Sequence, residues 1–359
     1  FFPEKREFFL EGRGIFEFAR GGFRSAIGGR RGGVVGGANA PTLFYSRRIG
    51  LQAGQVIPIF TGGRLTGKVG SFDVGALTVQ TGNEAVSTAT NTNFTVMRIK
   101  RGILRRSTIG GMFTSRSVSL VGNGSSQAFG LDASFSFFDN VNLLGYYAKT
   151  KAPGIDARDA SYQARFDYGG DRYGFQAEHL LVEDNFIPEV GFLRRDNFRQ
   201  TSLSGRFSPR PRSLRSVRQF VFEASLDYFL TADQGFLETR QNQIGFQAEF
   251  ENSDQIGVHL SDNYELLHVP FSPGSGQPIP VGGYEFNDLR MNYSLGPRRL
   301  LTGRVELAFG GYFDGEITSV NLGRGRLDLS AALSVEPTVS FNWITLPSGA
   351  FRTDLARTR

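Results

Sequence analysis

The sequence predicts an all-β protein, a transmembrane antiparallel up-and-down β-barrel of about eighteen or more strands with an irregular N-terminal segment. Three observations predict this fold class. Apolar and polar residues alternate with period two along many segments of the chain. These segments run for about 10 to 13 residues, close to the length at which a tilted strand crosses a membrane. The links between them are alternately short and long, as in a barrel with short periplasmic turns and longer outer loops.

The alternation is clearest in residues 129–137. Phe129, Leu131, Ala133, Phe135 and Phe137 alternate with small or polar residues, so one face of the predicted strand is apolar and the other is polar. Similar runs occur at 162–168, 220–230, 244–250, 289–295, 305–314 and 339–343. A soluble sandwich also buries one face of each strand, but its strands are usually shorter and its Greek-key links need not alternate in length.

The lengths of the predicted links indicate which side of the membrane each link lies on. Short links are expected at 70–71, 139–140, 170–172, 252–254, 296–299 and 336–337, and long links at 82–92, 119–126, 150–160, 183–196, 268–284 and 315–324. Two links fit less well, because 208–216 is long for a short position and 231–236 is short for a long one. Counting from Leu43 to Arg359 gives about eighteen strands, an even number that places both ends on the periplasmic side.

Composition excludes several other classes. The chain has no Cys and three His, so thiol chemistry, iron–sulfur ligation and a multi-histidine metal site are not expected, and we predict no metal and no cofactor. The net charge of +6 comes from Arg residues scattered among acidic ones, which does not favour nucleic acid as a partner. No run of about 20 apolar residues could form a membrane-spanning helix.

Residues 1–42 do not alternate and are predicted to form a separate segment, which lies in the lumen or at the periplasmic rim, ahead of the barrel at 43–359. The stretch 28–37 is Gly-rich and reads as a linker, because it lacks the strand, helix and Lys-Ser/Thr ending of a phosphate loop. The start at Phe1 without Met is what a processed or excised segment would show.

Five stretches resemble the barrel part of a known family. FFPEKREFFLEG (1–12), LFYSRRIGL (43–51), GGRLTGKVGSFDVGALTVQTG (62–82), PEVGFLRRDNFR (188–199) and WITLPSGAFRTDLARTR (343–359) are similar to the C-terminal barrel region of the DUF5916 family of bacterial outer-membrane proteins. The resemblance implies an outer-membrane location. It also implies a preceding domain like family 9 carbohydrate-binding modules and further strands beyond Arg359, both absent from this chain. The family implies no reaction.

Charged residues on the predicted polar faces are the candidate functional residues. If the apolar faces meet lipid, these side chains line the lumen, where they either select solutes or form cross-strand ion pairs that keep the wall rigid. They are Arg165, Asp167, Glu178, Arg206, Glu223, Asp227, Glu249, Arg290, Arg304, Glu306 and Asp328.

Catalytic arrangements are weaker candidates. Glu223 with Asp227, or Glu249 with Glu251, could supply the two carboxylates of a glycosidase, but a wet lumen would not raise either pKa. His259 and Ser261 share a face, yet a spacing of two residues strains a direct hydrogen bond. We therefore expect no catalytic residues and no enzyme activity.

Two long loops carry open alternatives. Loop 268–284 is rich in Pro and Gly and forms either a surface loop or a constriction, whereas loop 183–196 is apolar enough to pack on the lumen wall, a partner or lipid headgroups. The leading function is passage of small solutes, saccharides among them, through a bacterial outer membrane whose lipid is the main partner. The alternatives are a plugged barrel that anchors protein partners in a surface or secretion complex, and a barrel-embedded hydrolase.

Overall fold

The computed structural model is almost entirely β-structure. It describes residues 4–19, 39–273, 278–297, 299, 301–330 and 333–358. The helices in these ranges are single turns: α1 (Glu7–Leu10), η1 (Arg13–Phe16) and η2 (Ser46–Arg48). None of the helices described here is long and apolar enough to cross a membrane.

A short hairpin precedes the long strands, and it consists of β1 (Leu51–Gln52) and β2 (Gln55–Val56). Eighteen further strands follow within the described ranges, most of them long enough to cross a bilayer when tilted. They are β3 (Ile59–Val69), β4 (Phe72–Thr81), β5 (Thr92–Ile103), β6 (Ser107–Arg116), β7 (Ser126–Phe137), β8 (Val141–Lys151), β9 (Ala160–Gly169), β10 (Tyr173–Val182), β11 (Phe198–Phe207), β12 (Val217–Thr231), β13 (Leu237–Phe250), β14 (Gln255–Leu267), β15 (Gly282–Ser294), β16 (Leu301–Tyr312), β17 (Gly315–Ser330), β18 (Leu333–Val335), β19 (Pro337–Leu346) and β20 (Gly349–Thr358).

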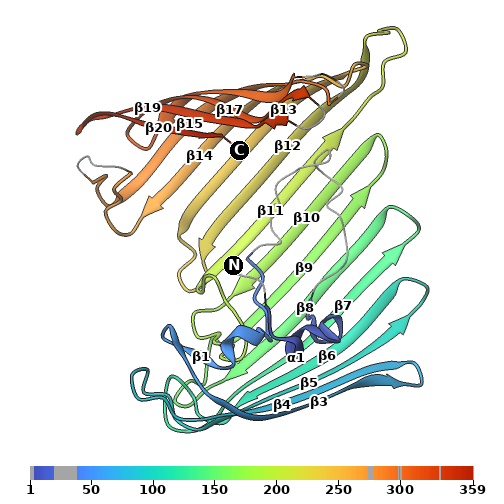
Figure 1. Cartoon of the computed structure of the whole chain (residues 1–359), viewed down its shortest axis with the longest axis vertical. Coiled ribbons are helices and arrows are strands. Elements are labelled where there is room, and N and C mark those ends of the chain that lie inside the picture. The colour runs from blue at the N-terminus through green and yellow to red at the C-terminus, as the bar shows by residue number, and fades with distance from the viewer. Residues whose placement is uncertain are drawn as a thin grey trace. The chain divides into compact units, whose positions relative to one another are not determined.

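The chain divides into two compact units, and each contains an antiparallel sheet in chain order (Figure 1). Unit 1 comprises Phe1–Gly169, Gln176–Thr201 and Thr231–Gly235, and its strands β3 to β9 pair consecutively. Unit 2 comprises Gly170–Phe175, Ser202–Leu230 and Phe236–Arg359. Its strands β12 to β17 pair consecutively, and β17 then pairs with β19 and β19 with β20. The predicted fold class, an up-and-down barrel wall of about eighteen antiparallel strands, is confirmed in strand number and order.

Each sheet has the two faces that the alternation predicts. One face carries large exposed apolar side chains, such as Leu131, Ile244 and Leu260 with 69, 68 and 57% exposure, and we call it the apolar face. The opposite face carries the intervening residues and is called the polar face. The cross-strand register keeps like beside like, because Ile244 pairs with Leu260 and Gly245 with His259.

The links alternate as predicted through unit 1. Short links at 70–71, 104–106 and 138–140 alternate with long ones at 82–91, 117–125 and 152–159. In unit 2 the prediction of a long link at 315–324 is wrong, because these residues lie inside β17 and pair with both β16 and β19. Their β-branched residues Ile317, Thr318 and Val320 favour a strand, and the Gly and charged residues among them had suggested a loop.

The chain before β3 differs from the prediction. A first wall strand was expected from Leu43, with the start of the wall at the short-link end. Instead, the first ladder strand begins at Ile59, which pairs with Thr81 beside the long link 82–91. Residues 43–56 turn away from the ladder through Gly50 and Gly54, both in left-handed backbone conformation (φ 79° and 80°). Leu43 and Ile49 are completely buried in the core of unit 1, whereas Leu51 and Val56 are exposed.

Candidate functional site

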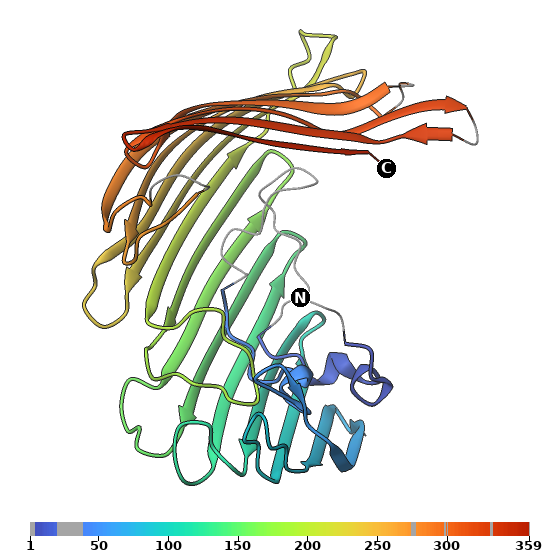
Figure 2. The same ribbon diagram turned by 60° about the vertical axis from the view of Figure 1, so that its left-hand side comes forward.

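The polar face of unit 1 is covered by the chain's own N-terminal segment. Residues 4–19, blue in Figures 1 and 2, lie against the β3–β9 sheet. Their rings lie over wall glycines: Phe8 over Gly62, Phe16 over Gly75 and Phe18 over Gly130. A Cβ on Gly130 would come within 2.5 Å of the Phe18 ring, so the ring fits because the wall residue has no side chain.

Polar contacts also hold the same segment. Arg64 on β3 donates to the carbonyl oxygens of Phe8 (2.6 Å) and Glu11 (2.7 Å). Arg98 on β5 donates two hydrogen bonds, of 2.6 and 2.8 Å, to the Asp132 carboxylate on β7, which also accepts from the Ala19 backbone N–H (3.1 Å). The Arg98 side chain is 1% exposed, so Asp132 both neutralises a buried charge and anchors the segment.

The loop that connects β10 to β11, residues 183–197, also covers this polar face. Residues 183–197 fold back onto 42–49, where Thr42 and Phe192 exchange backbone hydrogen bonds of 2.9 Å. Phe186 is completely buried, and the Glu189 side chain is 1% exposed. The Glu189 carboxylate accepts from Ser119 Oγ (2.6 Å) and the Leu120 N–H (2.9 Å). The open question about loop 183–196 is therefore resolved: it packs within its own unit.

Residues 4–19 and 183–197 together form what we call the inner layer. Glu4 gives this layer a predicted pH dependence. Its carboxylate accepts from Arg6 (2.7 and 2.9 Å) and Ser46 (2.6 Å), and the Arg6 hydrogen bonds lower the pKa of Glu4 from 4.5 to about 2. Because the folded pKa is depressed, its stabilisation is complete above pH 4.5 and is lost as pH falls through 2. We expect amide exchange in residues 4–11 to accelerate across this window, and Glu4→Gln to remove the acceleration. An identical pH profile in the variant would refute the assignment.

Three predicted residues form one cluster on the polar face of unit 1. Arg165 on β9 pairs with Asp167 at 2.7 Å and with Glu178 of β10 at 3.8 Å. Glu178 also accepts from Gln163 at 2.6 Å. Asp167 and Glu178 are 1% and 2% exposed, which fits a structural network better than a freely solvated lining.

Four predicted residues lie on β11, β12 and β13 in unit 2. Arg206 donates to the carbonyl oxygens of Gly170 (2.7 Å) and Asp171 (3.2 Å), so it fastens a turn. Asp227 accepts from Ser202 Oγ (2.6 Å), whereas Glu223 lies opposite Gly245 in the ladder. Glu249 accepts from Arg218 (2.8 Å) near the short-link end.

The remaining candidates lie on β15 to β17. Arg290 pairs with Asp288 (2.8 Å) and Arg304 with Glu306 (2.9 Å), each with the residue two positions along its own strand. Both pairs lie within one strand rather than across two strands, since residues at i and i+2 share a face and arginine spans that spacing. Asp328 belongs to β17, but its side chain lies outside the described residues.

The structure keeps Glu223 apart from Asp227 and holds Glu249 and Glu251 on one arginine. Glu223 and Asp227 lie four residues apart on one strand, roughly 14 Å at about 3.4 Å per residue, which exceeds the spacing of glycosidase carboxylates. Glu251 pairs with Arg218 (3.9 Å), which also binds Glu249. His259 lies over Gly245, and its neighbour Ser261 is buried without a hydrogen-bond partner among the described residues. No group in that part of the chain could hold a metal ion.

Around these charges the polar face of unit 2 is lined by uncharged polar side chains. Ser319 donates to Asn342 (2.7 Å), which donates to Thr353 (3.1 Å), across three neighbouring strands. Asn263 donates to Asp288 (2.9 Å), and Ser340 donates to Asn321 (2.5 Å). Such a face is wettable and carries charges of both signs in close pairs.

The sequence reasoning missed Arg98, Asp132 and Glu189, which form the charged contacts that anchor the inner layer. Asp132 is the charged residue of an otherwise small and hydroxyl-bearing polar series, Ser126, Ala128, Gly130 and Ser134, which is a signal that could have singled it out. Its partner is 34 residues away in the chain, and period-two alternation does not report on such pairing.

Comparisons with known proteins give weak likenesses. No family model and no curated protein matches the sequence. Among solved structures, a variant of OccD1 (OprD) is 12% identical with a TM-score of 0.41, covering 84% of this chain and 93% of that one. OccK10 (OpdN) of Pseudomonas aeruginosa is 9% identical (TM-score 0.40; 84% and 98% covered), and OccAB2 of Acinetobacter baumannii is 9% identical (0.39; 80% and 91%). Likeness at this level says nothing about what this chain does.

Proposed function

We propose that this chain is a bacterial outer-membrane β-barrel that passes small polar solutes along the polar faces of its sheets. The observation that carries the proposal is the separation of the two faces in unit 2. Ile244, Leu260 and Phe222 stand exposed on one face, while paired charges and amides fill the other. A bilayer covers the first kind of surface and water wets the second.

The separation also favours a selective rather than an inert wall. Arg290 is half-exposed on the polar face, with Asp288 as its partner at 2.8 Å, so its charge faces any solute on that side. Solutes that offer both donors and acceptors match a wall of amides, hydroxyls and paired charges. Saccharides and other small polar molecules belong to this class.

Conductance across a planar bilayer tests the proposal. We expect steady, salt-dependent current steps from the full chain, and a shift of ion selectivity towards cations in Arg290→Gln. The matched control is Arg352→Gln, which removes an arginine that stacks over Phe341 and Trp343 on the apolar face and leaves selectivity unchanged. A folded chain that inserts into the bilayer but carries no current would overturn the proposal that it forms a pore.

The inner layer of unit 1 favours a second candidate, a plugged barrel that anchors protein partners in a surface complex. Residues 4–19 and 183–197 are fixed to the polar face by Arg98, Asp132 and Glu189, as a permanent plug would be. A silent chain that co-purifies with stoichiometric partners would support this alternative.

We also infer membership of the DUF5916 type from the motifs quoted above. The first of these motifs supplies the contacts that anchor the N-terminal segment, including Glu4 to Ser46 and Arg6 to the Ile49 carbonyl (2.7 Å). Identifying a longer natural chain that continues through Phe1 into a carbohydrate-binding-like domain would test this inference, and a continuation into an unrelated domain would contradict it.

A further inference from the structure

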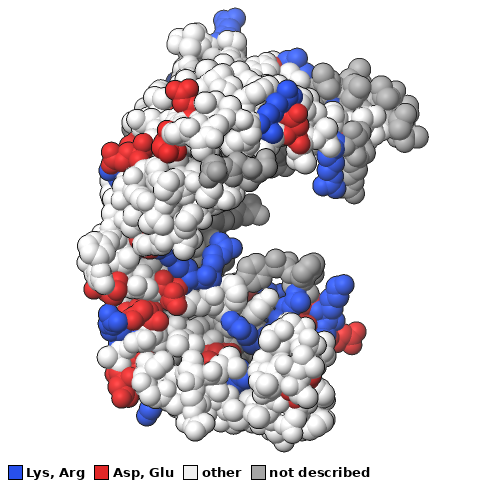
Figure 3. Space-filling model, turned by 90° about the vertical axis from the view of Figure 1, so that its left-hand side faces the viewer, with Lys and Arg blue, Asp and Glu red and all other residues white. Residues whose placement is uncertain are grey.

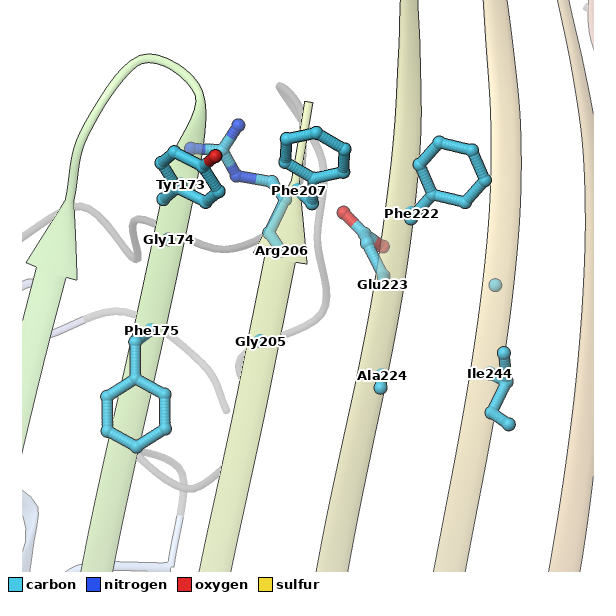
Figure 4. Close-up of a pocket in the computed structure, with 11 residues that line it drawn as sticks. Tyr173, Gly174, Phe175, Gly205, Arg206, Phe207, Phe222, Glu223, Ala224 and Ile244 are labelled. Atoms are coloured by element: carbon cyan, nitrogen blue, oxygen red, sulfur yellow. The ribbon is translucent and has the colours of Figure 1, made fainter. Parts of the chain in front are cut away.

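A depression of about 560 Å³ lies within unit 2 among residues of β10 to β13, most of whose exposed side chains belong to the apolar face. Its size is in the range of about 300–1,000 Å³ found for small-ligand sites. Gly205 and Ala224 form the floor, and the Ile244 and Phe175 side chains lie at its edge (Figure 4). A Cβ at Gly205 would meet no atom within 4 Å, so the wall is bare at this point.

Three aromatic rings close the end of the depression that is nearest the short links. Tyr173 stacks on Phe207 (centroids 5.2 Å apart, 23° between planes), and Phe207 on Phe222 (6.1 Å, 22°). Figure 4 shows these rings side by side on three neighbouring strands, with the small residues below them. Aromatic rings of this kind mark the level of the lipid headgroups in membrane barrels.

An arginine-rich link begins directly after Phe207. Residues 208–216 read SPRPRSLRS and form the link that was too long for its position. Figure 1 shows this link, yellow-green between β11 and β12, projecting from the sheet, and Figure 3 shows cationic side chains at the tip of the uppermost projection. The Pro209 carbonyl accepts from the Phe220 N–H (3.0 Å), which ties the start of the link to β12.

Two of the arginines have no protein partner among the described residues. Within the link Arg210 binds Asp171, and just beyond it, on β12, Arg218 binds Glu249 at 2.8 Å. Arg212 and Arg215 are exposed, and no hydrogen bond or ion pair of theirs is found in that part of the chain. The link that follows the aromatic rings therefore offers two exposed cations without protein partners in the described ranges, and in strand order it adjoins a bare apolar depression.

We infer that this surface binds an anionic phospholipid, with one acyl chain over Gly205 and Ala224 and the phosphate beside Arg212 and Arg215. The inference rests on the proposed membrane location. It fits the expected orientation, because short links lie on the periplasmic side, where the outer membrane presents phospholipids. A basic segment at a membrane surface attracts anionic lipid more strongly with each added arginine.

The test counts lipids that stay bound to the purified full chain by native mass spectrometry. The probes are phosphatidylglycerol and phosphatidylcholine with identical acyl chains, with inorganic phosphate as competitor. Wild type should retain phosphatidylglycerol preferentially. Arg212→Gln with Arg215→Gln should lower that preference roughly 25-fold, about fivefold for each arginine. Arg105→Gln with Arg106→Gln, in the short link of unit 1, removes the same number of charges at a site where Arg106 is paired with Asp139, and it should leave the preference for phosphatidylglycerol unchanged.

A separate variant, Gly205→Leu, tests whether the depression holds an acyl chain. Gly205→Leu fills the depression without a clash, because its Cβ points into open space and its backbone is not left-handed. It should lower retention of both lipids roughly tenfold, the contribution of one or two buried methylenes, and keep their ratio. Gly67→Leu on β3, equally open, is the control.

The outcomes separate this inference from the proposed function. A chain that conducts but shows no phosphatidylglycerol preference would overturn the lipid site and leave the pore standing. The opposite result would overturn the pore alone. If inorganic phosphate displaces the lipid and Gly205→Leu has no effect, the surface is an anion site without an acyl groove, and the inference fails.

Discussion

Asp132→Asn is expected to lower the free energy of unfolding by about 3–5 kcal/mol, since it leaves the Arg98 guanidinium buried without a counter-charge. It also weakens the acceptor that holds the Ala19 N–H, so the N-terminal segment should detach more readily. Urea unfolding of the chain in detergent measures the loss. Protease sensitivity of residues 4–19 reports the detachment.

A matched pair on neighbouring strands provides the control. Lys68 and Asp73 pair at 3.5 Å with side chains 70% and 42% exposed, so Asp73→Asn should cost about 0–1 kcal/mol. The double variant Arg98→Met with Asp132→Leu removes both charges and should recover most of the stability. Equal losses for Asp132→Asn and Asp73→Asn would show that the buried pair does not hold the segment.

Gly191→Ala is expected to separate the β10–β11 loop from residues 42–45. A Cβ at this position would come within 1.9 Å of the Thr42 carbonyl oxygen and 2.9 Å of the Leu43 carbonyl carbon, both backbone atoms that cannot rotate away. Relief of such a contact costs about 1–3 kcal/mol. Exchange of the Thr42 and Phe192 amides should therefore accelerate roughly 5- to 150-fold.

Gly14→Ala controls for the loss of glycine itself, because a Cβ at Gly14 meets nothing within 4 Å. Unchanged amide exchange in Gly191→Ala would mean that the loop does not rest on Thr42. Asp132→Asn and Gly191→Ala probe different anchors of the same layer, and their effects on stability should therefore be nearly additive.

Local pattern predicted the wall well. Alternation at 129–137 and 220–230 depends on neighbours two residues apart, so it placed Phe222 and Ile244 on one face and Glu223 on the other. Period-two alternation did not predict the structure where residues contact segments that are distant in the sequence. The wall was expected to begin at Leu43, but Leu43 and Ile49 are buried, and the Tyr45 N–H donates to the Val190 carbonyl of the β10–β11 loop.

The candidate site was predicted in part. Polar-face charges such as Arg165, Arg290 and Arg304 lie on the expected face, but their partners could not be read from composition. The Arg98–Asp132 and Arg116–Glu189 pairs join residues 34 and 73 positions apart, and depend on which strands and loops fold together. Link 208–216 stood out in the sequence as too long for its position, and the structure shows that Arg212 and Arg215 within it are exposed.

Spin labels along β14 test most directly whether the wall separates lipid from water. The chain has no Cys, so single cysteines from Ile256 to Tyr264 can be labelled without background. In bilayers, labels at 256, 258 and 260 should be accessible to oxygen dissolved in lipid, and labels at 257, 259 and 261 to a water-soluble nickel reagent. Two accessibilities that alternate out of phase with period two are the predicted result. Water access at every position, or no alternation, would contradict the account.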